Sequence, residues 1–126
     1  MFNKTIDLDL AKKKILLDTI REFAENRDYE VREEVNGPKH QLVVYDRKPE
    51  SSFLVSSLEM FAGSSLLPDR VRLESKITEL EDKLGVSVLG EVMMKGSNYV
   101  NRRPSKRDTL RCKDIFEAFF QKISSI

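Results

Sequence analysis

The apolar residues between positions 7 and 27 recur with the period of an amphipathic helix. One face of this helix carries Leu16, Ile20, Phe23 and Ala24, while lysine and glutamate side chains occupy the other face. Asp7 stands where an N-cap is expected, because its carboxylate can accept a hydrogen bond from a free N–H group of the first turn. The pattern predicts a helix over residues 7–27 that buries the four apolar side chains.

A period of two follows, which is typical of strands. Residues 29–35 alternate apolar and charged side chains, and residues 42–45 form a continuous apolar run. Together they predict an antiparallel hairpin, with a connection longer and looser than a two-residue Asn-Gly turn. Because more than half of its residues are charged, the first strand is expected nearer the edge of the sheet than the second.

Residues 53–61 fit either a helix or a strand. A helix would place Leu54, Leu58 and Phe61 on one face, whereas a strand would align Leu54 and Leu58 with Met60. We favour the strand, because a two-stranded hairpin alone makes a poor sheet.

The most regular repeat lies between residues 69 and 84. Its apolar positions, spaced four, three and four residues apart, are Leu73, Ile77, Leu80 and Leu84. This heptad-like spacing predicts a helix. The strip is shorter than the three or four heptads that a coiled coil usually needs, so we expect it to pack on its own sheet, with a homodimer as the alternative.

Two more elements complete the pattern. Residues 86–94 predict a strand with Val86 and Val88 facing inward. A terminal helix over residues 107–124 has an apolar stripe made of Ile115, Phe116, Phe119, Phe120 and Ile123. The chain is therefore predicted to form a single α/β domain of the α+β type over residues 1–126, in which three helices cover a small, mostly antiparallel sheet of three to four strands.

Positive charge is concentrated in one stretch. Residues 95–113 hold seven basic side chains against the single acidic Asp108, a net charge of +6 in a chain whose total is +1. The basic residues are Lys95, Arg102, Arg103, Lys106, Arg107, Arg111 and Lys113. Residues 96–107 have no apolar periodicity, so we expect an exposed basic loop there.

The composition of this stretch favours a polyanion as partner. Cations contact phosphates, and an aromatic ring such as Tyr99 can stack on a base. The loop also runs into the N-terminus of the last predicted helix, whose free N–H groups attract anions. An acidic protein is the second candidate partner. The third interpretation is a loop without a partner, either solvated and basic by chance or paired with the acidic remainder of the chain. Ser105, which follows two arginines and a proline, matches the target pattern of basophilic kinases, and its phosphorylation would offset their charge.

Other functional classes receive little support. The single cysteine, Cys112, cannot form an internal disulfide, and neither a signal peptide nor a run of about 20 apolar residues is present, so we expect a cytoplasmic protein without membrane contact. Cys112 and the single histidine, His40, are too few for a zinc site and lack a recognisable third catalytic group. No Gly-rich phosphate loop is present. We expect no catalysis, metal or cofactor.

The predicted order of helix, three strands, helix and strand resembles the core of the restriction-endonuclease-like nucleases. That resemblance implies an Asp in the second strand and a Glu-x-Lys in the third. Here Gln41 precedes the apolar run of the second strand and Asp46 follows it, while the third offers Glu59 without the lysine. The resemblance thus implies an inactive or divergent relative, with displaced carboxylates at Asp46 and Glu59. The order is also similar to the small dimeric chaperones of bacterial secretion systems, which tend to be acidic.

These patterns lead to one main functional expectation. The protein is predicted to be non-enzymatic and to contact nucleic acid or another polyanion through Lys95, Tyr99, Arg102, Arg103, Lys106, Arg107, Arg111 and Lys113. The alternative is a protein-interaction adaptor or chaperone, working as a homodimer or through an apolar face.

Overall fold

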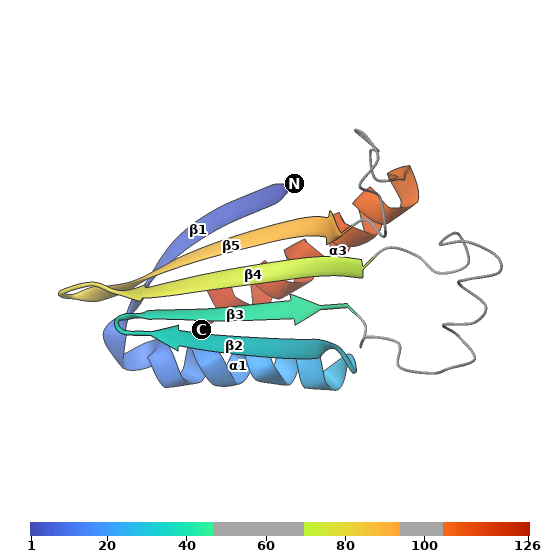
Figure 1. The fold of residues 1–126 in the computed structure, drawn as a ribbon. Helices are drawn as coiled ribbons and strands as arrows, with labels where there is room; N and C mark the ends of the chain where they lie inside the picture. Colours follow the sequence, from blue (N-terminus) through green and yellow to red (C-terminus); the bar gives the residue numbers. More distant parts are fainter. Residues whose placement is uncertain (47–69, 94–104) are drawn as a thin grey trace.

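The computed structural model describes residues 1–46, 70–93 and 105–126. These residues form one antiparallel sheet with two α-helices packed on one of its faces (Figure 1). The elements are β1 (Phe2–Asp9), the 3-10 turn η1 (Leu10–Lys12), α1 (Lys13–Asn26), β2 (Glu30–Asn36), β3 (Lys39–Tyr45), β4 (Arg70–Glu79), β5 (Lys83–Met93) and α3 (Lys106–Ser124). The strand order is β1-β5-β4-β3-β2, and each neighbouring pair is antiparallel.

The α+β class is confirmed, but the predicted number of elements is wrong. The described residues contain five strands and two α-helices, instead of three to four strands and three helices. Their element order therefore also differs from the order on which the two family resemblances rested. Residues 53–61 lie outside the described part of the chain.

Helix α1 buries the predicted apolar face but begins later than predicted. Its buried residues are Leu16, Ile20, Phe23 and Ala24. Asp7 is not an N-cap, because it belongs to β1, the edge strand that pairs with β5 from Phe2↔Gly90 to Asp9↔Lys83. Asp9 instead caps the 3-10 turn η1 that precedes α1, and its Oδ1 accepts a hydrogen bond from the N–H of Ala11 at 3.3 Å.

The hairpin of β2 and β3 is confirmed, but its connection is shorter than predicted. Asn36 pairs with Lys39, so only Gly37 and Pro38 form the turn. Gly37 has a φ of +62°, while the proline ring fixes a negative φ at the next position. This combination is that of a type II′ turn, whose twist matches the twist of the two strands. Strand β2 is an edge strand, as predicted.

The helix predicted over residues 69–84 does not exist. The segment forms β4 and the turn into β5, with Leu73 and Ile77 buried in β4 and Leu84 buried in β5. Leu80 lies at the turn and is 44% exposed. Residues four apart share a face in a strand as they do in a helix, so the spacing alone did not separate the two structures. The heptad strip that would have carried a homodimer is therefore not formed.

Helix α3 follows the predicted terminal helix closely. It buries Ile115, Phe116, Phe119 and Ile123 against the sheet, while Phe120 is half-buried. Ser105 is its N-cap, and the side-chain hydroxyl accepts a hydrogen bond from the N–H of Asp108 at 3.1 Å. Phe119 meets Phe23 of α1 edge-to-face, with ring centroids 5.2 Å apart, which joins the two helices over the core.

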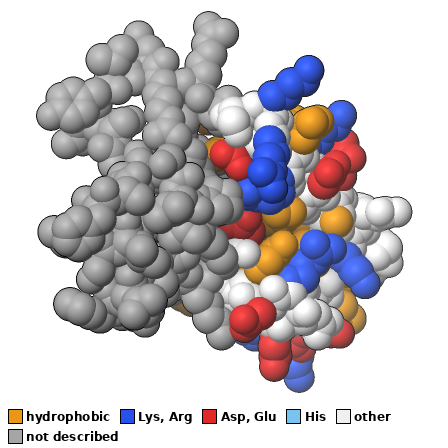
Figure 2. Space-filling view, turned by 90° about the vertical axis from the view of Figure 1, so that its right-hand side faces the viewer, with side chains coloured by type: hydrophobic (Ala, Val, Ile, Leu, Met, Phe, Trp, Pro, Cys, Tyr) orange, Lys and Arg blue, Asp and Glu red, His pale blue; other side chains and the backbone are white. Residues whose placement is uncertain are grey.

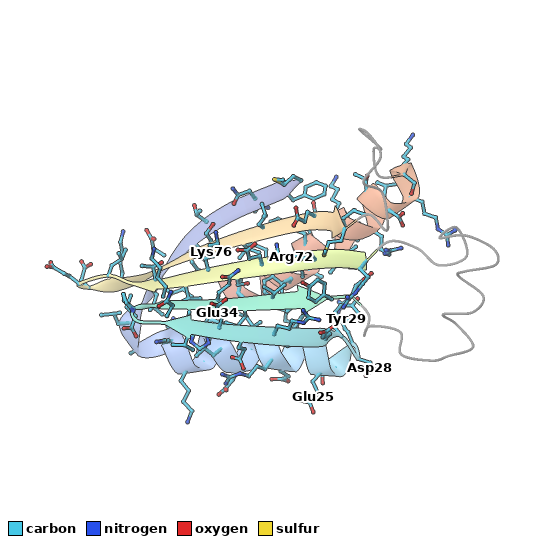
Figure 3. The ribbon with its side chains drawn as sticks, in the orientation of Figure 1. Glu25, Asp28, Tyr29, Glu34, Arg72 and Lys76 are labelled. Carbon is cyan, nitrogen blue, oxygen red and sulfur yellow. The ribbon has the colours of Figure 1, made fainter. Side chains whose placement is uncertain are left out.

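The two faces of the sheet differ in character. The face under α1 and α3 contributes apolar side chains to the core, among them Val71, Leu73, Val86 and Val88. Val86 and Val88 face inward as predicted. The opposite face, called the open face below, is covered by no described helix and carries mainly charged and polar side chains (Figure 3).

Candidate polyanion-binding surface

The predicted binding residues divide into two groups. Lys95, Tyr99, Arg102 and Arg103 lie outside the described residues, as does most of the predicted loop over residues 96–107. Lys106, Arg107, Arg111 and Lys113 lie in the first two turns of α3. The structure therefore brings four of the eight predicted residues together on one short stretch of helix.

Three of these four side chains are exposed. Lys106, Arg107 and Lys113 point away from the core side of α3, and none of them forms an ion pair with another residue of the described ranges. Leu110 lies between them in sequence and is 52% exposed. The first two turns of α3 thus present three cations around one apolar side chain.

Arg111 has a different environment and is tied into the fold. Its Nε lies 3.1 Å from Oδ2 of Asp46, and its Nη1 lies 2.9 Å from Oδ1 of Asp108. The Asp46 carboxylate is almost fully buried and also accepts a hydrogen bond from the N–H of Val71 at 2.9 Å. Arg111 therefore connects the start of α3 to the adjacent ends of β3 and β4. The carboxylates of Asp46 and Asp108 neutralise the positive charge of its guanidinium group.

The cations of the open face are mostly paired as well. Arg72 Nη1 lies 2.7 Å from Glu74 and 3.1 Å from Glu91, and Lys76 lies 3.4 Å from Glu74. Burial by itself raises the pKa of Glu74, but the hydrogen bond and charge of Arg72 outweigh it, so the pKa lies below its ordinary value. Figure 3 shows Arg72 and Lys76 on this face. A surface in which cations and carboxylates alternate offers a polyanion little net attraction.

The same pairing continues around Tyr45. The guanidinium groups of Arg70 and Arg32 lie 4.1 and 5.4 Å from the centroid of its ring, and Glu30 forms ion pairs with both arginines. Burial raises the pKa of Glu30, but hydrogen bonds from Arg32 and Arg70 lower it below its ordinary value. In Figure 2, which views this end of the molecule, the visible basic side chains are interspersed with acidic and apolar ones.

His40 and Cys112 are not brought together as a reactive pair. Burial raises the pKa of the Cys112 thiol, so this cysteine is a poor nucleophile. His40 is 8% exposed, and its Nε2 lies 3.4 Å from Glu33. Within residues 1–46, 70–93 and 105–126, no group of three or more His, Cys, Asp or Glu residues is arranged to hold a metal ion.

Sequence reasoning missed the role of Asp46. The nuclease resemblance proposed this residue as a displaced metal ligand, but its carboxylate is committed to Arg111 and to the N–H of Val71. No local sequence signal links Asp46 to Arg111, since the two meet only in the folded chain. Glu59, the other displaced carboxylate, lies outside the described residues.

Comparisons with known proteins assign no family. No family model matches the chain, and no match was found among curated proteins. The vertebrate conserved region of human METTL16 is a similar solved structure, with a TM-score of 0.48 and 8% sequence identity over 97% of this chain and 98% of that one. The structure of Ara h 8.0201 gives a TM-score of 0.37 and 14% identity over 99% and 97%. Both TM-scores are below 0.5, so these similarities assign neither a fold family nor a function to this chain.

Neither α1 nor α3 has the length and apolar character needed to span a membrane.

Proposed function

We propose that this protein is a non-enzymatic binding protein that contacts a polyanion, foremost a nucleic acid, through the start of α3 and the basic segment before it. The observation that carries the proposal is the exposure of Lys106, Arg107 and Lys113 without an ion-pair partner among the described residues. Cations of the open face such as Arg72 are, in contrast, paired with glutamates. Within residues 1–46, 70–93 and 105–126, three cations without ion-pair partners therefore lie close together at the start of α3.

The physical basis of the proposal is that the electrostatic attractions of several exposed cations add together. Exposed cations that lie close together attract successive phosphates, and each contact releases counterions from the polyanion. The helix dipole adds a partial positive charge at the same end of α3. Arg111 supports the surface indirectly, because its ion pairs with Asp46 and Asp108 fix the orientation of the first turns.

A matched pair of triple variants tests the proposal. The first replaces Lys106, Arg107 and Lys113 with Ser, and the second replaces three other exposed lysines, Lys14, Lys39 and Lys122, with Ser. Both variants remove the same charge. We expect only the first to bind labelled single- or double-stranded oligonucleotides more weakly, and to flatten the slope of log affinity against log salt by roughly 0.7–0.9 for each phosphate that the variant no longer neutralises.

Two results would count against this function. Equal losses of affinity in both variants would mean that net charge alone drives binding. Absence of binding by the unmodified protein at about 50 mM salt, where phosphate contacts are strong, would exclude nucleic acid. Polyglutamate serves as a second probe, and binding of it without binding of oligonucleotides would favour the acidic protein partner instead. Because the replaced side chains are exposed, thermal stability should stay nearly unchanged.

A further inference from the structure

The outer edge of β2 has no strand partner in the described structure. β2 stands at the end of the strand order, and only β3 pairs with it (Figure 1). The pairing runs without interruption from Glu30↔Tyr45 to Asn36↔Lys39. A regular edge strand of this kind presents a row of backbone groups to which another extended chain can add.

The geometry of the hairpin identifies those backbone groups. In a two-residue turn the C=O of Asn36 faces the N–H of Lys39, so Asn36 belongs to a hydrogen-bonded pair. Such pairs alternate along an antiparallel ladder, so the N–H and C=O groups of Val31, Glu33 and Val35 point away from β3. Among the described residues, no other element forms a hydrogen bond to these groups.

Side-chain exposure indicates that the second half of this edge is accessible. Val35 is 65% exposed, although its side chain lies on the helix side of the sheet. The side chain of Glu33, on the same side, is 34% exposed. Glu34 faces the other side and is exposed as well (Figure 3). Arg21 of α1 pairs with the carboxylate of Glu33, but α1 does not cover Glu34 and Val35.

The surroundings of this edge are acidic. Residues 22–34 contain six acidic and two basic side chains, and of the six Glu33 is paired with Arg21 and Glu30 with Arg32 and Arg70. Figure 3 shows Glu25 and Asp28 at the end of α1 beside the start of β2, with Glu34 further along the strand. Glu34 forms no ion pair with another described residue. Acidic side chains next to unpaired backbone groups are complementary to an extended segment that carries basic residues.

We propose that β2 binds a basic, extended peptide segment of a partner protein as a sixth strand of the sheet. The backbone groups of Val31, Glu33 and Val35 would supply the hydrogen bonds. Lys or Arg residues at alternate positions of the peptide would lie opposite Glu34 on one side of the sheet, where opposite charges across strands are favourable. This surface is separate from the start of α3. It would bind a positively charged partner, whereas the start of α3 would bind a negatively charged one.

A second copy of this chain fits the same edge poorly. Antiparallel self-pairing centred on Glu33 or on Glu34 would place that glutamate opposite its own copy. Self-pairing centred on Arg32 would place Glu30 opposite Glu34. Like charges directly opposite each other are destabilising. Pairing of β2 with β2 of a second copy is therefore unfavourable, whereas pairing with a basic strand is favourable.

The other edge of the sheet is protected in a different way. Lys4 of β1 lies on the helix side of the sheet, with its Nζ 5.2 Å from the centroid of the Phe120 ring. A charged side chain directed inward on an edge strand opposes the addition of another strand, because the incoming chain would bury the charge. β2 also carries an inward charge, Glu33, but Arg21 of α1 already pairs with it, whereas Lys4 has no ion-pair partner among the described residues. β2 is therefore the better candidate for strand addition.

The test uses a fluorescein-labelled peptide of roughly eight alternating Lys and Thr residues, a length that matches an average strand. Val35→Pro removes one outward N–H without removing a hydrogen bond to β3, whereas Val35→Thr keeps the N–H. By fluorescence anisotropy, we expect Val35→Pro to weaken binding about tenfold or more and Val35→Thr to change it little. Glu34→Lys, an exposed charge reversal, should also weaken binding and serves as the second variant if Val35→Pro lowers thermal stability.

Further controls separate strand addition from simple charge attraction. Two further versions of the peptide, N-methylated either at the Lys or at the Thr residues, keep its charge, and one of them lacks the N–H groups that would face β2. Equal binding of all three peptides would overturn the proposal. If the unmodified protein and the Glu34→Lys variant bind the peptide equally well, the peptide binds elsewhere on the protein, and the proposal is overturned as well. A concentration-dependent dimer that Val35→Pro converts to monomer in sedimentation would assign the edge to a second copy instead. The Lys106, Arg107 and Lys113 variant should bind the peptide normally, which keeps this test independent of the proposed polyanion site.

Discussion

Gly90 of β5 is the position at which helix α3 approaches the sheet most tightly among the described glycines. A Cβ atom built on Gly90 would lie 2.7 Å from Cδ2 and 3.3 Å from Cβ and Cγ of Phe116. Phe116 is 2% exposed, and its ring lies 5.9 Å from that of Phe2 and 6.3 Å from that of Phe120, measured between centroids. The ring therefore has little room to move, and we expect Gly90→Ala to strain the contact between α3 and β5.

The magnitude follows from two opposing effects. Replacing Gly by Ala within a strand gains about 0.5–1 kcal/mol, because glycine loses more backbone entropy on folding. Overpacking a closed core costs about 1–3 kcal/mol. We therefore expect Gly90→Ala to lower the free energy of unfolding by up to about 2.5 kcal/mol, and to leave the protein about 1–3 kcal/mol less stable than a Gly-to-Ala change without the clash, seen as a lower urea midpoint with an unchanged slope.

Gly85 in the same strand provides the control. A Cβ atom there would meet only Cδ1 of Leu80 at 3.6 Å and the carbonyl oxygen of Thr78 at 3.9 Å, which are ordinary contacts. Gly85→Ala should leave stability unchanged or raise it slightly. In a Phe116→Leu background, Gly90→Ala should become nearly neutral, which gives a favourable coupling between the two changes. Equal effects of Gly85→Ala and Gly90→Ala, or no coupling to position 116, would refute this reasoning.

Two further predictions concern backbone conformation and pH. Asp28 has a φ of +56° just after α1, where the N–H of Tyr29 bonds to the C=O of Ala24 in a Schellman arrangement. Asp28→Gly should exceed Asp28→Ala in stability by about 1 kcal/mol in thermal or urea unfolding, and both lack the carboxylate, so equal stability would contradict the backbone explanation. Glu74 has a lowered pKa in the folded state, so its charge stabilises the fold at neutral pH and this contribution is lost as the pH falls through the folded pKa. Glu74→Gln should therefore destabilise the protein by about 1–3 kcal/mol at pH 7, and the difference should shrink in urea titrations as the pH falls through the folded pKa; a constant difference at all pH values would assign the effect to packing.

The sequence predicted the elements in which the apolar period is complete. Helices α1 and α3 were located because their buried faces carry apolar residues at regular spacing, and β3 was located because residues 42–45 form a continuous apolar run. Strand β4 was mistaken for a helix because the buried Ser75 interrupts its alternation, which left Leu73 and Ile77 as the visible signal. Apolar residues four positions apart fit a helix as well as a strand, so the polar Ser75 at a core position led to the wrong prediction of a helix.

Strand β1 was missed for a related reason. Its inward positions are Phe2, Lys4, Ile6 and Leu8, and the lysine breaks the apolar alternation. The structure shows that this lysine lies over the Phe120 ring at the edge of the core, which no local pattern could reveal. The candidate site could also be predicted only in part. The sequence identified the basic residues near the start of α3. It did not show that Arg111 is neutralised, because Arg111 and Asp46 lie far apart in the chain and meet only in the folded protein.

The pairing of β1 with β5 has a consequence for the order in which the protein assembles during synthesis. Strands β2 with β3 and β4 with β5 are joined by short turns, so each pair can form as soon as it leaves the ribosome. Of the five described strands, β1 emerges first, yet its partner β5 emerges only after β2, β3 and β4 have been made. Until then Phe2, Ile6 and Leu8 remain without their sheet. Lys4 and Asp7 lie among these apolar residues, and charges in such positions lower the tendency of an unpaired apolar strand to aggregate.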